Sequence, residues 1–84
     1  MNHRRLLEFS RIKARIAHHV QLLEIKLELA TARVDLEPHV ELLVLLVGNA
    51  RALAGETVEV SAFAEQIASL AARVEARPHL QLVR

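Results

Sequence analysis

The N-terminal quarter of the chain carries a row of basic side chains whose spacing suits contacts with anions. On a helix, which turns by about 100° per residue, positions 4, 11, 15 and 18 lie on one face. These positions hold Arg4, Arg11, Arg15 and His18, with Arg5 and Lys13 nearby. Guanidinium groups on one face can contact the carboxylates of an acidic protein surface or the phosphates of nucleic acid. We therefore predict a partner-binding surface at Arg4, Arg11, Arg15 and His18, with a protein as the main expectation and nucleic acid as the alternative.

Other residues that could do chemistry lack the spacing of a catalytic or metal site. The five histidines, His3, His18, His19, His39 and His79, include no pair three or four residues apart. Zinc-binding and metalloprotease motifs depend on such pairs, so we predict no metal. The carboxylate pairs Glu24/Glu28 and Glu37/Glu41 each span one helical turn and are expected to be solvated. Gly-rich phosphate loops and nucleophile elbows are absent, so the sequence predicts no cofactor and leans away from an enzyme.

The composition predicts one all-helical domain over residues 1–84. Of the 84 residues, 52% are hydrophobic but only Phe9 and Phe63 are aromatic, so the core must be aliphatic, as in helical bundles. The absence of cysteine fits a reducing compartment, and no apolar run is long enough to span a membrane. We therefore expect a cytoplasmic protein. A chain of this size supports only a marginal core, which makes oligomerisation plausible.

Three helices are predicted, at about residues 3–36, 38–54 and 58–77, followed by a tail at 78–84. The first is long because no Gly or Pro interrupts residues 6–36, which at about 1.5 Å per residue gives a rod of roughly 45–50 Å. We expect Pro38 to end this helix or to open the next, with Asp35 or Glu37 as a cap. Gly55 should end the second helix and Thr57 should cap the third.

The apolar side chains of these helices occupy more faces than one chain can cover. One face of the first helix carries a continuous apolar series that includes Phe9, Ile12, Ile16, Val20, Leu23, Leu27 and Val34. A nearly opposite face carries Leu22, Ile25, Leu29 and Leu36. The second helix is apolar almost all round, apart from a narrow strip through Glu41, Gly48 and Arg51, and the third has one apolar seam. We therefore predict a helical-bundle homodimer with coiled-coil-like packing, whose interface contains Leu22, Ile25, Leu29 and Leu36.

Charge is unevenly distributed along the chain, although the net charge is only +1. Residues 1–20 carry five Lys and Arg side chains against Glu8, whereas residues 21–65 carry three against eight acids. Head-to-tail or antiparallel pairing of two chains would place the basic end of one beside the acidic middle of the other, at short range because salt screens such attraction.

The outline of a long first helix followed by two shorter ones resembles the dimeric all-helical chorismate mutases. The resemblance implies that arginines of the first helix hold a dianionic substrate. Residues available for such a site are Arg11 or Arg15, Arg33, Glu41 and Gln81. No lysine follows Lys26, whereas that family places a lysine near its first connection. The resemblance covers topology rather than motifs.

The leading hypothesis is a non-enzymatic protein–protein interaction module that acts as a homodimer, such as an adaptor, chaperone, assembly factor or small inhibitor. The first alternative is a nucleic-acid-binding regulator that uses the same basic row, and the second is an enzyme similar to chorismate mutase. The high content of Arg, Ala, Leu and Val, with few Lys, is typical of a GC-rich genome, and a bacterial or phage origin is expected.

Overall fold

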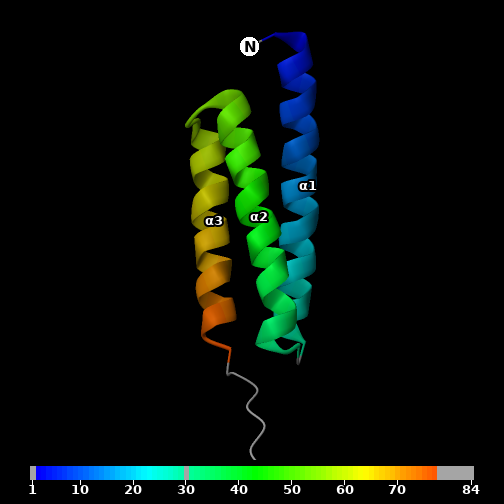
Figure 1. Cartoon of the computed structure of the whole chain (residues 1–84), viewed down its shortest axis with the longest axis vertical. Helices are drawn as coiled ribbons and strands as arrows, with labels where there is room; N and C mark the ends of the chain where they lie inside the picture. The colour runs from blue at the N-terminus through cyan, green and yellow to red at the C-terminus, as the bar shows by residue number, and fades with distance from the viewer. Residues whose placement is uncertain (1, 30, 78–84) are drawn as a thin grey trace, which may run out of the picture.

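The chain folds into three helices, each antiparallel to the one before it. A computed structural model describes residues 2–29 and 31–77, with α1 over His3–Glu28, α2 over Arg33–Ala54 and α3 over Val58–Glu75. Figure 1 shows α1 running along the molecule in one direction, α2 returning beside it and α3 running parallel to α1. Helix α1 is the longest, with 26 residues. The prediction of an all-helical chain with one long and two shorter helices is confirmed for the described residues.

Side-chain caps and one glycine set several helix ends where the sequence predicts them. The Asn2 side chain accepts a hydrogen bond from the Arg5 amide at 2.8 Å and begins α1. The Thr57 hydroxyl accepts one from the Val60 amide at 3.1 Å and begins α3. Gly55 has a positive φ of 77°, which L residues rarely adopt, and its amide donates to the Arg51 carbonyl at the end of α2. The predicted roles of Gly55 and Thr57 are therefore confirmed.

The boundary between the first two helices differs from the prediction. Helix α1 ends at Glu28 instead of residue 36, and α2 begins at Arg33 with Ala32 as an N-cap that makes no side-chain hydrogen bond. Pro38 lies inside α2, neither ending one helix nor opening the next. Because Pro38 is the sixth residue of α2, it lies past the first four amides that lack an intrahelical partner, and it removes one backbone hydrogen bond from the second turn. At 26 residues α1 is about 39 Å long, shorter than expected.

A side chain that is distant in the sequence holds the end of α1. The Arg77 guanidinium donates hydrogen bonds to the carbonyl of Leu29 at 3.1 Å and to the carbonyl of Leu27 at 2.5 Å. Carbonyl groups in the last turn of a helix lack intrahelical partners, and a cation there also offsets the negative end of the helix dipole. The chain therefore reverses after Leu29 without a Gly or Pro, because a contact across the fold satisfies the end of the helix. Helix α3 itself ends at Glu75, two residues before the predicted end at residue 77.

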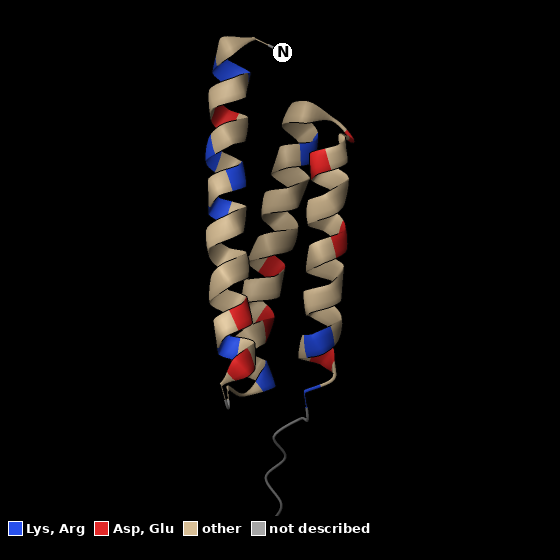
Figure 2. Cartoon of the chain, turned by 180° about the vertical axis from the view of Figure 1, so that it is seen from behind, with Lys and Arg blue, Asp and Glu red and all other residues tan. Residues whose placement is uncertain are grey.

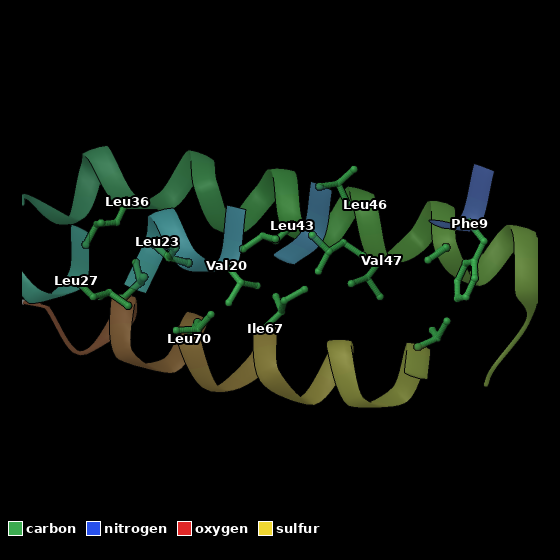
Figure 3. Close-up of a cluster of buried hydrophobic side chains, with 14 residues drawn as sticks. Phe9, Val20, Leu23, Leu27, Leu36, Leu43, Leu46, Val47, Ile67 and Leu70 are labelled. Atoms are coloured by element: carbon green, nitrogen blue, oxygen red, sulfur yellow. The ribbon is translucent and has the colours of Figure 1, made fainter. Parts of the chain in front are cut away.

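A single aliphatic core joins the three helices. Its side chains interdigitate between α2 and α3, with α1 completing the third side, and Phe9 closes one end (Figure 3). No polar or charged residue of the described chain is buried. The core residues are Phe9, Ile16, Val20, Leu23, Leu27, Leu36, Leu43, Leu46, Val47, Ala50, Val60, Ile67, Leu70 and Val74.

The second apolar series of the sequence divides between two helices. Leu36 is completely buried in the core, because the reversal after Leu29 turns α2 back onto α1. It is therefore unavailable as an interface residue in this fold. Val34, which the periodicity assigned to the packed face, is 67% exposed for the same reason. The three- and four-residue spacing of apolar residues continues through the turn in the sequence. Because the chain reverses there, residues before and after the turn face different directions.

Candidate interaction surfaces

The outer face of α1 places the predicted basic residues in one row. Arg4, Arg11, Arg15 and His18 are all exposed, on the side of α1 opposite Phe9 and Ile16. Figure 2 shows the cationic positions gathered in the N-terminal half of α1, whereas acidic positions dominate its other end. In Figure 1 the first turns of α1 extend beyond the connection between α2 and α3. Arg4 lies in this projecting part, and Arg11 and Arg15 lie farther along the rod.

Some of the nearby cations already have partners within the chain. Lys13 lies 3.2 Å from the carboxylate of Glu59, and its ammonium group lies 5.0 Å from the centre of the Phe9 ring. These contacts fasten α1 to the start of α3, so Lys13 serves the fold. Arg4 forms an exposed ion pair with Glu8 at 3.8 Å, a contact of little energetic weight. Among the ion pairs of the described residues, none involves Arg11 or Arg15.

The basic row continues into an apolar segment at the other end of α1. Ile25 is 51% exposed and Leu29 is 58% exposed, whereas Leu22 is half-buried. These residues follow Arg11, Arg15 and His18 at helical spacing, so one face of α1 is basic and then apolar. Three of the four predicted interface residues, Leu22, Ile25 and Leu29, therefore share this face.

A small basic cluster lies between α1 and α2. The Lys26 ammonium nitrogen and the His39 ring nitrogen Nε2 are 3.0 Å apart, which requires the ring to accept the hydrogen bond. Partial burial lowers the pKa of His39 below its ordinary value of 6.5, and the positive charges of Lys26 and His19 lower it further. The Nδ1 atom of His19 is buried without a hydrogen-bond partner in the described structure. His19 and His39 thus face the packed body, whereas His18 faces solvent.

The residues that could serve an enzyme are not gathered at one place. Arg15 lies at the middle of α1, 13 residues or about 20 Å of helix before its end, whereas Arg33 begins α2 beyond the turn. Gln81 lies outside the described residues. Over residues 2–29 and 31–77, no group of three His, Asp or Glu side chains is placed to hold a metal ion. Within the described residues of a single copy, Arg15 and Arg33 are therefore not brought together.

A shallow apolar groove runs between α2 and α3. It has a volume of about 220 Å³ and is lined on the α2 side by Val44, Val47 and Arg51. The α3 side is formed mainly by small side chains, Ala64, Ala68 and Ala71, so the groove floor lies low between the helices. All lining residues come from α2 and α3. Val44 is 58% exposed, so a large apolar side chain stands at the α2 rim of the groove.

The groove continues into an acidic hollow toward the N-terminal end of α2. This second hollow, of about 280 Å³, shares Ala71 with the first and carries the carboxylates of Glu37, Glu41 and Glu75. Glu37 accepts a hydrogen bond from Arg33 at 3.2 Å. Within the described chain no ion pair involves Glu41 or Glu75.

The opposite end of the groove carries Arg51, which is paired within the chain. Arg51 donates a hydrogen bond to Glu56 at 2.5 Å, and Ser61 donates to the same carboxylate at 2.8 Å. These hydrogen bonds lower the pKa of Glu56 below its ordinary value of 4.5. The groove therefore carries carboxylates at one end and apolar side chains in the middle, and at the other end it carries Arg51 paired with Glu56.

Comparison with protein-family models, curated proteins and solved structures finds no match for this chain. None of the helices in the described part of the chain combines the length and apolarity that crossing a membrane requires. Any function assigned to the candidate surfaces must therefore be argued from the geometry of this chain alone.

Sequence reasoning identified the outer face of α1 but missed the groove. Its signals were present as the alanines beside the α3 seam and the polar strip Glu41, Gly48 and Arg51 of α2.

Proposed function

We propose that this chain is a non-enzymatic protein–protein interaction module that acts as a homodimer. The observation that carries the proposal is the apolar surface that the folded chain leaves in water. Six large aliphatic side chains of α1, α2 and the turn between them are more than half exposed: Leu6, Ile25, Leu29, Val34, Val44 and Leu45. Complete burial of such a side chain is worth roughly 1.5–3 kcal/mol, so covering the exposed halves in an assembly would supply several kcal/mol.

The outer face of α1 is the surface that we assign to another protein. Its basic half attracts an acidic surface, and its apolar half, with Ile25 and Leu29, supplies area that charge alone does not. Charge complementarity contributes mainly to association rate and specificity, whereas buried apolar contacts slow dissociation. A partner surface that is acidic and then apolar along about 30 Å would fit this face.

Reversal of two arginine charges tests the assignment. The full chain is recovered with its partners from the organism that encodes it, and the bound proteins are identified by mass spectrometry. We expect Arg11→Glu/Arg15→Glu to lose a partner that the wild-type chain retains, with unchanged helical content because both side chains are exposed. Arg73→Glu, an exposed change on α3, is the matched control and should retain it. Recovery of the same proteins by the wild-type chain and the double variant would contradict the assignment.

Nucleic acid is the second candidate for the same basic row, favoured by the exposed positions of Arg4, Arg11 and Arg15. Binding of random duplex DNA distinguishes the two. A nucleic-acid contact releases counterions, so its affinity should fall steeply with salt and disappear in Arg11→Glu/Arg15→Glu. The protein-binding proposal predicts no such binding at physiological salt.

A further inference from the structure

The side chains of α2 beside the groove form a row that is complementary to itself. Glu37, Glu41, Val44, Gly48 and Arg51 follow one another at steps of four, three, four and three, so they lie on one side of α2. We infer that a second copy of this chain docks here, with its α2 antiparallel to the first α2 and a twofold axis near Val44. The inference rests on the proposed homodimer and specifies its interface as the face of α2 and α3, leaving α1 for the other partner.

The charges of this row match under that symmetry. Glu37 and Arg51 are each seven residues from Val44, one toward each end of α2. A twofold axis at Val44 therefore sets Arg51 of each copy at the level of Glu37 of the other. Each of these residues already pairs within its own chain, Glu37 with Arg33 and Arg51 with Glu56. The second copy would join these pairs into alternating rows of positive and negative groups, whereas a parallel arrangement would set like charges side by side.

The middle of the row supplies apolar contacts and space. Val44 stands at the rim, and the Val44 side chain of a second copy would enter the groove above Ala64 and Ala68. Gly48 has no packing role within its own chain, because a Cβ added there would meet no atom within 4 Å. Glycine inside a helix is less stable than alanine, and close approach of a neighbouring helix offsets that cost.

The available area is adequate for a modest dimer. Helices of 22 and 18 residues are about 33 and 27 Å long, and neighbouring helices pack about 10 Å apart. The face that α2 and α3 present together is therefore on the order of 600 Å². A standard interface buries about 800 Å² on each partner, so this face is large enough for an interface at the small end of the usual range.

Charge exchange between the two ends of the row tests the inference in the full chain. The dimer dissociation constant is measured by sedimentation for wild type, Glu37→Arg, Arg51→Glu and Glu37→Arg/Arg51→Glu. Each single change should weaken the dimer roughly tenfold or more, because it opposes like charges at two symmetric places. The double change should return the constant to within about threefold of wild type. Glu37 and Arg51 are about 21 Å apart along one helix, so this rescue requires contact between copies.

Further variants separate the possible outcomes. Glu65→Arg, an exposed change outside the groove, should leave the dimer intact, and Val44→Glu should abolish it while circular dichroism shows retained helix. A wild-type chain that is dimeric, dissociates with Ile25→Glu and ignores the α2 changes would overturn the groove inference but leave the proposed homodimer standing. A wild-type chain that is monomeric at high micromolar concentration would overturn both. Absence of rescue in the double variant would overturn the antiparallel pairing.

Discussion

At the scale of single residues, His39 links the stability of the fold to pH. The ring accepts a hydrogen bond from Lys26 at 3.0 Å and is partly buried against α1, where His19 also lies. A protonated ring would lose that hydrogen bond and face the positive Lys26 ammonium group at the same distance. The neutral ring is therefore the form that the folded state favours, which is why the pKa of His39 is lowered.

We predict that acid weakens the fold through His39. The unfolded chain binds a proton here near pH 6.5, whereas the folded chain binds it only at lower pH. The contribution of His39 to the free energy of unfolding should therefore be fully present above pH 6.5. It should decrease as the pH falls from there through the lowered pKa of His39 in the folded chain. Urea unfolding between pH 7.5 and 5 measures the decrease. His39→Gln keeps a neutral acceptor for Lys26 and should flatten the profile, whereas the exposed His18→Gln should not; equal profiles for wild type and His39→Gln would contradict the prediction.

At the scale of secondary-structure elements, the turn between α1 and α2 depends on a contact from beyond α3. Arg77 bonds the carbonyls of Leu27 and Leu29. These bonds satisfy acceptors that the end of α1 leaves open, and they join the first and last helices at one end of the bundle.

Removal of this guanidinium should destabilise the end of α1. We expect Arg77→Ala to lower the free energy of unfolding by about 1–2 kcal/mol, because two charge-assisted hydrogen bonds are lost at a half-buried position. Amide hydrogen exchange should also increase in the last turn of α1. Arg73→Ala removes an exposed arginine from the same region and serves as the matched control, with little expected effect. Equal stabilities of the two variants would show that the Arg77 bonds do not hold the turn.

The helices could be predicted from sequence wherever a local signal marks their ends. Gly55 and Thr57 determine the second turn through backbone conformation and a side-chain cap, and both were predicted. The first turn contains neither Gly nor Pro in its described residues, and Pro38 gave a false signal six residues into α2. The stabilising contact comes from Arg77, nearly fifty residues away, and no local pattern reveals it.

At the scale of the whole molecule, the sequence indicated an excess of apolar surface but not where it lies. Periodicity placed Leu36 beside Ile25 and Leu29, and the reversal of the chain moved Leu36 into the core. The groove between α2 and α3 arises from the way two helices with different side-chain sizes lie against each other. The way in which the helices lie beside one another depends on all three of them together, so the composition of one helix could not show it.

A single copy of the chain leaves two apolar surfaces in water. The outer face of α1 and the groove face of α2 and α3 both present apolar side chains to water, and each combines them with charge. Under the proposed function, these two faces would bind another protein and a second copy of the chain at the same time. We expect the homodimer to persist when the basic row of α1 is altered.

Sedimentation equilibrium of the wild-type chain tests the central claim most directly. Measurements from about 1 to 200 µM at physiological salt should give a mass that rises with concentration toward twice the 9.4 kDa of the chain. A mass that remains at 9.4 kDa throughout this range would show that the exposed apolar faces do not pair two copies, and would contradict the account.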